Sequence, residues 1–159
     1  MAERDRDESG RPQSARPRDA LGRPLSRGSQ GVVPIPDDLA LSPAESLAYA
    51  QDLIDQGLAF NAHEVLEAAW KAGPVDEKPL WQGLAQLAVG ITHVQRGNVD
   101  GALALLRRAS SHLAGIDGTA PHSVDVAGLI DYAGALVQDL TDRVDVNAER
   151  LRPRLTGRK

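Results

Sequence analysis

The sequence predicts an all-α protein, a compact bundle of about five helices with a tetratricopeptide-like helical hairpin in the middle. Apolar residues recur at intervals of three and four through most of residues 41–142, the spacing of a helix with one buried face. Capping residues and glycine or proline stops divide this region into helix-sized segments. No segment shows the alternation of apolar and polar residues that is typical of a strand, so we expect no strand.

The chain divides into three regions by composition and charge. Residues 1–40 carry seven basic and seven acidic side chains, are rich in proline, glycine and serine, and lack apolar periodicity. Such a segment buries too little surface to offset the entropy of ordering it, which predicts a disordered leader. Residues 41–142 carry five basic against thirteen acidic side chains and form the single helical domain. Residues 143–159 carry six basic against two acidic ones, which predicts a frayed or disordered basic tail.

Composition also limits the chemistry. The 159 residues include no cysteine, which excludes disulfides, thiolate nucleophiles and cysteine-ligated zinc or iron–sulfur centres. Motifs for nucleotide, flavin or haem are absent, so a divalent metal is the cofactor that stays open. No stretch has the roughly 18 apolar residues of a membrane span, and we expect a cytoplasmic protein. The acidic body disfavours nucleic acid as a partner, whereas a homo-oligomer stays open.

The first helix is predicted over about 43–57. Ser42-Pro43-Ala44-Glu45 is a capping box with proline at the first helical position, and Gly57 ends the run. Between these ends the helical spacing is continued by Leu47 and Ile54.

The second helix is predicted over about 61–72, with Asn61 as its cap and Gly73-Pro74 as its stop. At about 100° per residue, one narrow stripe of this helix holds Phe60, His63, Glu67 and Trp70. A histidine and a carboxylate on an apolar stripe are unusual, because burying an unpaired charge is costly. We therefore expect both side chains to be buried and to have polar partners from elsewhere in the chain.

The third helix is predicted over about 79–95 and has no charged residue, which is typical of a central helix. Its apolar face consists of Leu80, Leu84, Leu87, Ile91 and Val94. Gly83, Gly90 and Gly97 recur every seven residues, and each glycine inside a helix costs about 1 kcal/mol against alanine. This spacing indicates that a neighbouring backbone comes close.

The fourth and fifth helices are predicted over about 99–113 and 125–142. Asn98 and Asp125 are their expected caps, and Gly115 closes the fourth. The expected buried residues of the two helices are Leu103, Leu106, Leu113, Leu129, Ala133, Leu136, Val137 and Leu140.

The polar residues of the second and third helices are expected to meet. About six residues join these helices, which favours antiparallel neighbours and places Gln82 and Gln86 nearest to Glu67 and His63. We interpret the cluster as a small pocket in which His63 and Glu67 act as an acid–base pair or as metal ligands. The expected ligand-binding residues are Trp70, Gln82, Gln86, His93 and Arg96. The alternative is a polar network that fixes helix register without chemistry.

Two specific kinds of metal site are not favoured, a zinc protease site and a di-iron site. The run from His63 to Glu67 is one residue away from the zincin pattern H-E-x-x-H, but a carboxylate stands where the second histidine belongs. A ferritin-like di-iron bundle takes carboxylates from four helices, and the predicted third helix has none.

The spacing His63-x-x-x-Glu67-x-x-Trp70, then Trp81-Gln82-Gly83-Leu84-Ala85-Gln86, then His93-x-x-Arg96-Gly97-Asn98 with Gly101-Ala102, resembles a known family. It is the bacterial and archaeal family catalogued as domain of unknown function 309, here in its actinobacterial form with a long disordered leader rich in arginine and proline. The resemblance covers about residues 44–115. It implies a compact all-helical domain without an established reaction, in which these His, Glu, Trp, Gly and Gln positions are the signature.

Two functions compete at this point. The first is a site for a small molecule or a metal, including a hydrolase. The second is a non-catalytic protein-interaction module, because Gly90, Gly97, Ala102 and Ala109 loosely follow one tetratricopeptide hairpin. A binding groove in such proteins needs about three stacked repeats, and we find only one such hairpin. The sequence leaves open whether the protein is an enzyme.

Overall fold

In the computed structural model the described residues are 5–6, 12–13, 40–116 and 120–157. Most of the predicted leader therefore lies outside the described residues, and its disorder stays a prediction. Within the leader, β1 (Asp5–Arg6) and β2 (Pro12–Gln13) form a short antiparallel pair. Strands of two residues are too short to produce an alternation in the sequence.

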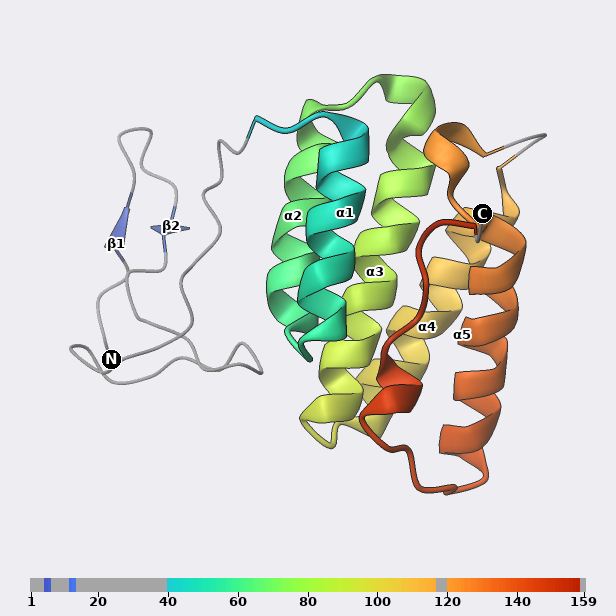
Figure 1. The fold of residues 1–159 in the computed structure, drawn as a ribbon. Coiled ribbons are helices and arrows are strands. Elements are labelled where there is room, and N and C mark those ends of the chain that lie inside the picture. The colour runs from blue at the N-terminus through green and yellow to red at the C-terminus, as the bar shows by residue number, and fades with distance from the viewer. Residues whose placement is uncertain (1–4, 7–11, 14–39, 117–119, 158–159) are drawn as a thin grey trace.

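The all-α fold is confirmed (Figure 1). The α-helices of the described chain are α1 (Pro43–Asp55), α2 (Ala59–Ala72), α3 (Lys78–Gln95), α4 (Val99–Ala114) and α5 (Val126–Thr141). Three short 3₁₀ segments are η1 (Val75–Glu77), η2 (Pro121–Ser123) and η3 (Glu149–Leu151). Among the described residues no helix combines the length and the apolar character needed to cross a bilayer.

The helix ends follow the predicted caps except at α2. Side-chain oxygens accept a hydrogen bond from the first-turn backbone at Ser42, Asn98 and Asp125. In contrast, α2 begins two residues before the predicted cap, at a Leu58 cap without a side-chain bond. Asn61 is buried in the first turn, where its side-chain amide donates to Glu64 Oε1 at 3.2 Å.

Each helix packs mainly against its neighbours in the sequence, α1 on α2, α2 on α3, α3 on α4 and α4 on α5 (Figure 1). The short connection through η1 joins α2 and α3, which run antiparallel as expected (Figure 1). The apolar face of α3 lies in the hydrophobic core, with at most 1% exposure at Leu80, Leu84, Leu87 and Ile91. This position of α3 between α2 and α4 explains why the helix has no charged residue between its first residue and its end.

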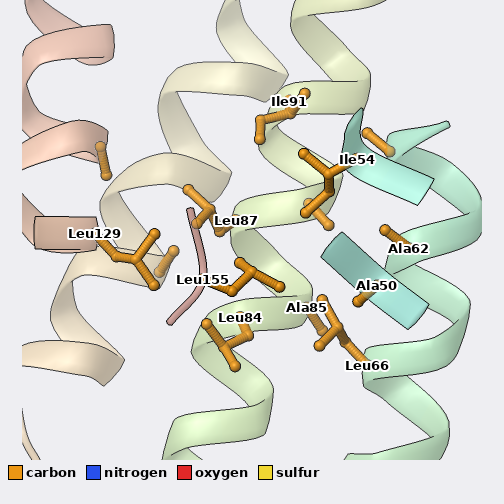
Figure 2. Packing of buried hydrophobic residues seen from close by; sticks show 14 of the residues in the cluster. Ala50, Ile54, Ala62, Leu66, Leu84, Ala85, Leu87, Ile91, Leu129 and Leu155 are labelled. Carbon is orange, nitrogen blue, oxygen red and sulfur yellow. The ribbon is translucent and has the colours of Figure 1, made fainter. Parts of the chain in front are cut away.

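The C-terminal segment differs from the expected frayed tail. Residues 143–157 are described, and Leu155 is 1% exposed within the core (Figure 2). Gln51 of α1 holds this segment, because its Oε1 accepts from Leu155 N at 2.8 Å and its Nε2 donates to the Pro153 carbonyl at 2.9 Å. The backbone of Leu155 in turn accepts from Asp125 N at the start of α5. The segment therefore links the first helix to the last.

Candidate functional site

The stripe of α2 lies at the edge of the buried face and not at its centre. The centre is formed by fully buried small and branched residues, among them Ala62, Val65 and Leu66. The His63 side chain is 22% exposed and the Glu67 side chain 41% exposed. The expected burial of Glu67 is thus wrong. Because α2 packs on both α1 and α3, its buried face is broader than the stripe, and the stripe lies at the border of that face.

The partners of Glu67 come from its own helix. His63 Nε2 lies 2.9 Å from Glu67 Oε2, and Lys71 Nζ lies 3.3 Å from Glu67 Oε1. Both partners are four residues away, which places them on the same side of the helix. Glutamine amides were the partners expected from the sequence, yet Gln82 and Gln86 make no hydrogen bond with His63 or Glu67 in the described chain.

His63 is held in its neutral form. Burial lowers the pKa of His63 below the ordinary value of 6.5, and the nearby Lys71 lowers it further. The Glu67 carboxylate and the Phe60 carbonyl act in the opposite direction but with less effect. A neutral imidazole that faces a carboxylate through Nε2 carries its proton there and donates it. Its Nδ1 is buried, so Glu67 and not His63 offers the accessible basic atom.

A pocket of about 170 Å³ lies between α2 and α3 beside this pair. The lining residues are His63, Glu67, Trp70, Gln82, Ala85, Gln86 and Val89. Five residues singled out from the sequence therefore line one pocket. They are His63, Glu67, Trp70, Gln82 and Gln86. The antiparallel arrangement explains this result, because Gln82 and Gln86 are one turn apart on the side of α3 next to α2.

Trp70 is fixed at the pocket by the first residue of α3. Lys78 Nζ donates to the Trp70 carbonyl at 2.8 Å and lies 5.2 Å from the centre of the Trp70 ring. The indole Nε1–H of Trp70 is buried and has no hydrogen-bond partner among the described residues. An unpaired buried donor is costly, but this N–H is enclosed by protein atoms as His63 Nδ1 is, so it is not open to the pocket.

His93 and Arg96 do not line this pocket. His93 lies near the end of α3, where its Nδ1 is 3.1 Å from Asn98 Nδ2. Arg96 places its guanidinium 5.8 Å from the centre of the Phe60 ring. His93 is four residues beyond Val89, the last residue of α3 that lines the pocket, which places it about 6 Å further along the helix. The prediction that these two residues bind the same ligand has no support in the geometry.

His112 of α4 also belongs to the surroundings of the pocket, although no pattern in the sequence singled it out. Its Nδ1 lies 2.7 Å from Gln86 Oε1, so the amide expected at the pair on α2 is bonded to α4 instead. The sequence does offer one indication of its position. His112 precedes Leu113, and if α4 packs against the glycines of α3, these two residues come close to Gln86.

The metal interpretation has only two donors. Within the described residues there is no group of three or more His, Asp or Glu side chains that could hold a metal ion. Catalytic zinc takes three protein ligands as a rule, and di-iron sites take more. His63 and Glu67 alone do not form such a donor set.

A family model described as domain of unknown function (DUF309) matches residues 47–105. No curated protein and no solved structure gives a match. The matched segment runs from α1 into α4 and contains every residue that lines the pocket. The match supports the DUF309 family for this segment, which is the part of the chain that builds the pocket.

Proposed function

We propose that the pocket between α2 and α3 binds a small organic molecule with an apolar body and a polar end that donates a hydrogen bond to Glu67. The observation that carries this proposal is the pocket itself, in which a carboxylate, an indole and two amides border one space of about 170 Å³. Apolar cavities of about 150 Å³ accept a molecule the size of benzene. The ligand is therefore expected to be of similar size.

Charge restricts the polar end of the ligand. Glu67 carries the only formal charge among the lining residues, because His63 is kept neutral by burial. The negative charge of Glu67, reduced by Lys71 Nζ at 3.3 Å, favours an amine or another donor over a carboxylate or a phosphate. The Trp70 ring also favours a cation, although the Lys78 Nζ already lies 5.2 Å from the centre of this ring.

Binding is proposed here without a reaction. An acid–base mechanism through His63 would need an accessible ring nitrogen, but Nδ1 is buried and Nε2 faces Glu67. A metal-dependent hydrolase would need more donors than the pair on α2 provides. The geometry thus favours recognition over hydrolysis.

A purely structural role explains the pair less well. A polar network that fixes register must connect two elements. The bonds of Glu67 to His63 and to Lys71 both lie within α2, so they do not set the position of α3. The bond between Gln86 and His112 does connect two helices, and it is the better candidate for that role.

A protein-interaction module is the second candidate. Packing of each helix on its sequence neighbour is the arrangement of solenoid repeats, which supports this candidate. However, Leu155 and the C-terminal segment cover the inner apolar surface that such an array would offer to a peptide (Figure 2). We therefore rank it below the small-molecule pocket.

Titration with benzylamine tests the proposal, because this cation combines a ring of suitable size with a donor. We expect the ¹H–¹⁵N signals of Trp70, Gln82 and Gln86 to shift in a saturable way. Glu67→Gln should weaken binding roughly tenfold or more, which is the loss of one charge-assisted hydrogen bond. The matched control is Asp131→Asn, which removes an exposed carboxylate of α5 outside the pocket. Equal affinity of the Glu67→Gln and control proteins, or no saturable shift, contradicts the proposal.

A further inference from the structure

The orientation of the Gln86 amide follows from the position of His112. His112 Nδ1 lies 2.7 Å from Gln86 Oε1 and 3.0 Å from the Arg108 carbonyl oxygen one turn earlier on α4. A backbone carbonyl only accepts hydrogen bonds, so Nδ1 must carry a proton. The Gln86 atom that faces the same N–H must then be the amide oxygen. Gln86 Nε2 is left without a partner among the described residues.

We propose that His112 is a positioning residue that holds the Gln86 amide with its N–H₂ group toward the pocket, so that the site selects ligands with a hydrogen-bond acceptor. This inference rests on the proposed function, since it names the chemistry of the same pocket. His112 itself does not line the pocket and acts only through Gln86. Protonation of the imidazole at Nε2 leaves the Nδ1–H in place, so the orientation is independent of the charge on His112.

The backbone of α3 is built to admit His112 at this place. A Cβ atom at Gly83 would lie 2.9 Å from Leu113 Cδ2 and 3.4 Å from His112 Cβ, so the glycine leaves room for the Leu113 side chain and for α4 at this distance. Gln86 follows Gly83 by three residues and lies one turn further along, between the side of α3 that faces α4 and the side that faces α2. The hydrogen bond between His112 and Gln86 therefore depends on the close packing of α3 and α4 at Gly83.

The polar groups of the pocket define the ligand class. The Gln86 Nε2 group is the donor, because Gln86 bonds to His112 through its oxygen, and the Glu67 carboxylate is the acceptor. A molecule that satisfies both kinds of group carries an acceptor oxygen next to a donor nitrogen on an apolar body. A primary carboxamide has this pattern. We infer that the pocket prefers neutral carboxamides of about the size of benzamide.

The first test concerns the free protein. Long-range ¹H–¹⁵N spectra report which imidazole nitrogen of His112 carries the proton, and nuclear Overhauser contacts report where the Gln86 amide protons lie. We expect the Nδ1–H form at neutral pH, with the amide protons near residues that line the pocket. The Nε2–H form, or amide protons next to the imidazole, overturns the inference whatever binds in the pocket.

The second test compares benzamide, which has the acceptor, with benzylamine, which lacks it. The ratio of their two dissociation constants is the readout, because a general loss of stability does not change it. Gln86→Glu keeps an acceptor for His112 but presents a carboxylate to the pocket, so the preference for benzamide should fall by about three- to tenfold. His112→Phe frees the amide to rotate and should lower the preference in the same direction.

The matched control is His122→Phe, which makes the same replacement at a histidine of η2 that bonds to Glu77 instead. It should leave the ratio unchanged. An unchanged ratio in both Gln86→Glu and His112→Phe overturns the selectivity assigned here. If neither probe binds the wild-type protein, the proposed function fails, while the spectra of the first test still decide the orientation of Gln86.

Discussion

His63 experiences two opposing influences on its charge. Burial favours the neutral imidazole, and the Glu67 carboxylate at 2.9 Å favours the protonated one. Burial has the larger effect, since the pKa of His63 lies below 6.5. The reason is that Glu67 is itself 41% exposed and is shared with Lys71, so its field at the imidazole is weakened by solvent and by the opposite charge.

The lowered pKa of His63 predicts how stability depends on pH. Because the unfolded chain takes up the proton near pH 6.5 and the folded protein only at lower pH, the unfolded state gains more protons on acidification. The contribution of neutral His63 to stability is therefore present above pH 6.5 and is lost as the pH falls below it. We expect the free energy of unfolding to fall more steeply between pH 7 and 5 in the wild type than in His63→Gln, as measured by urea denaturation at each pH.

The difference between the two proteins is the quantity to compare. His93 also has a lowered pKa because of burial and Arg96, but it is present in both proteins and its effect cancels. The opposite result would be a wild-type protein that gains stability relative to the variant on acidification. In that case the attraction of Glu67 outweighs burial, and the pKa of His63 is not lowered.

At the scale of elements, the glycines of α3 show how much the sequence could predict. The spacing indicated close approach of a neighbour, and at Gly90 a Cβ would lie 2.9 Å from Leu106 Cδ2 and 3.4 Å from Leu106 N of α4. Gly97 has another reason for being glycine. It has no neighbour within 4 Å of a Cβ, but its φ of +75° ends α3 in a left-handed turn. A seven-residue repeat in the sequence does not separate these two causes.

Replacing glycine by alanine therefore has opposite effects in two helices. In Gly90→Ala, the new methyl group meets the fully buried Leu106, and overpacking of about 1–3 kcal/mol outweighs a gain in helix propensity of about 1 kcal/mol. In Gly134→Ala of α5, nothing lies within 4 Å, and the protein should gain about 1 kcal/mol. Urea denaturation of both variants measures the sign. A stabilised Gly90→Ala protein would show that α3 and α4 do not pack this closely.

Five of the residues that line the pocket were predictable from the sequence, whereas the placement of His93 and Arg96 and the bonding within the site were not. Helical spacing and a short connection suffice to bring His63, Glu67 and Gln86 to one pocket, because both are local properties of the chain. The partner of Gln86 depends on how α4 sits against α3, which no local pattern specifies. The burial of Glu67 was misjudged for a similar reason, since one helix face does not show how many neighbours cover it.

At the scale of the whole molecule, the C-terminal segment was the largest difference between expectation and structure. Its net positive charge suggested a solvated tail, yet buried and exposed residues alternate along it, with Leu151, Pro153 and Leu155 buried and Arg152 and Arg154 exposed. Three apolar residues among arginines are a weak signal in a sequence. The partner that orders the segment, Gln51, is more than a hundred residues away along the chain.

This segment closes a fold whose helices otherwise contact mainly their sequence neighbours. It joins α1 to the start of α5, through the two bonds of Gln51 and the bond from Asp125 N to the Leu155 carbonyl. Leu155 fills the space that an open array would leave between the helices, as its place among Leu84, Leu87 and Leu129 in Figure 2 shows. The segment thus contributes to the stability of the whole bundle and not only of its own end.

Leu155→Ala should therefore destabilise the whole bundle by about 2–5 kcal/mol, the usual range for removing a fully buried leucine side chain. Arg154→Ala removes a larger side chain that is exposed and should change stability by no more than about 0.5 kcal/mol. Urea denaturation followed by circular dichroism at 222 nm measures both, because the helical signal reports on α1 to α5 together. If the segment were only a surface strap, Leu155→Ala would resemble Arg154→Ala, and amide exchange would accelerate near residue 155 alone. If it is part of the core, exchange in α1 and α5 should accelerate together with it, because both helices lose the contact that connects them.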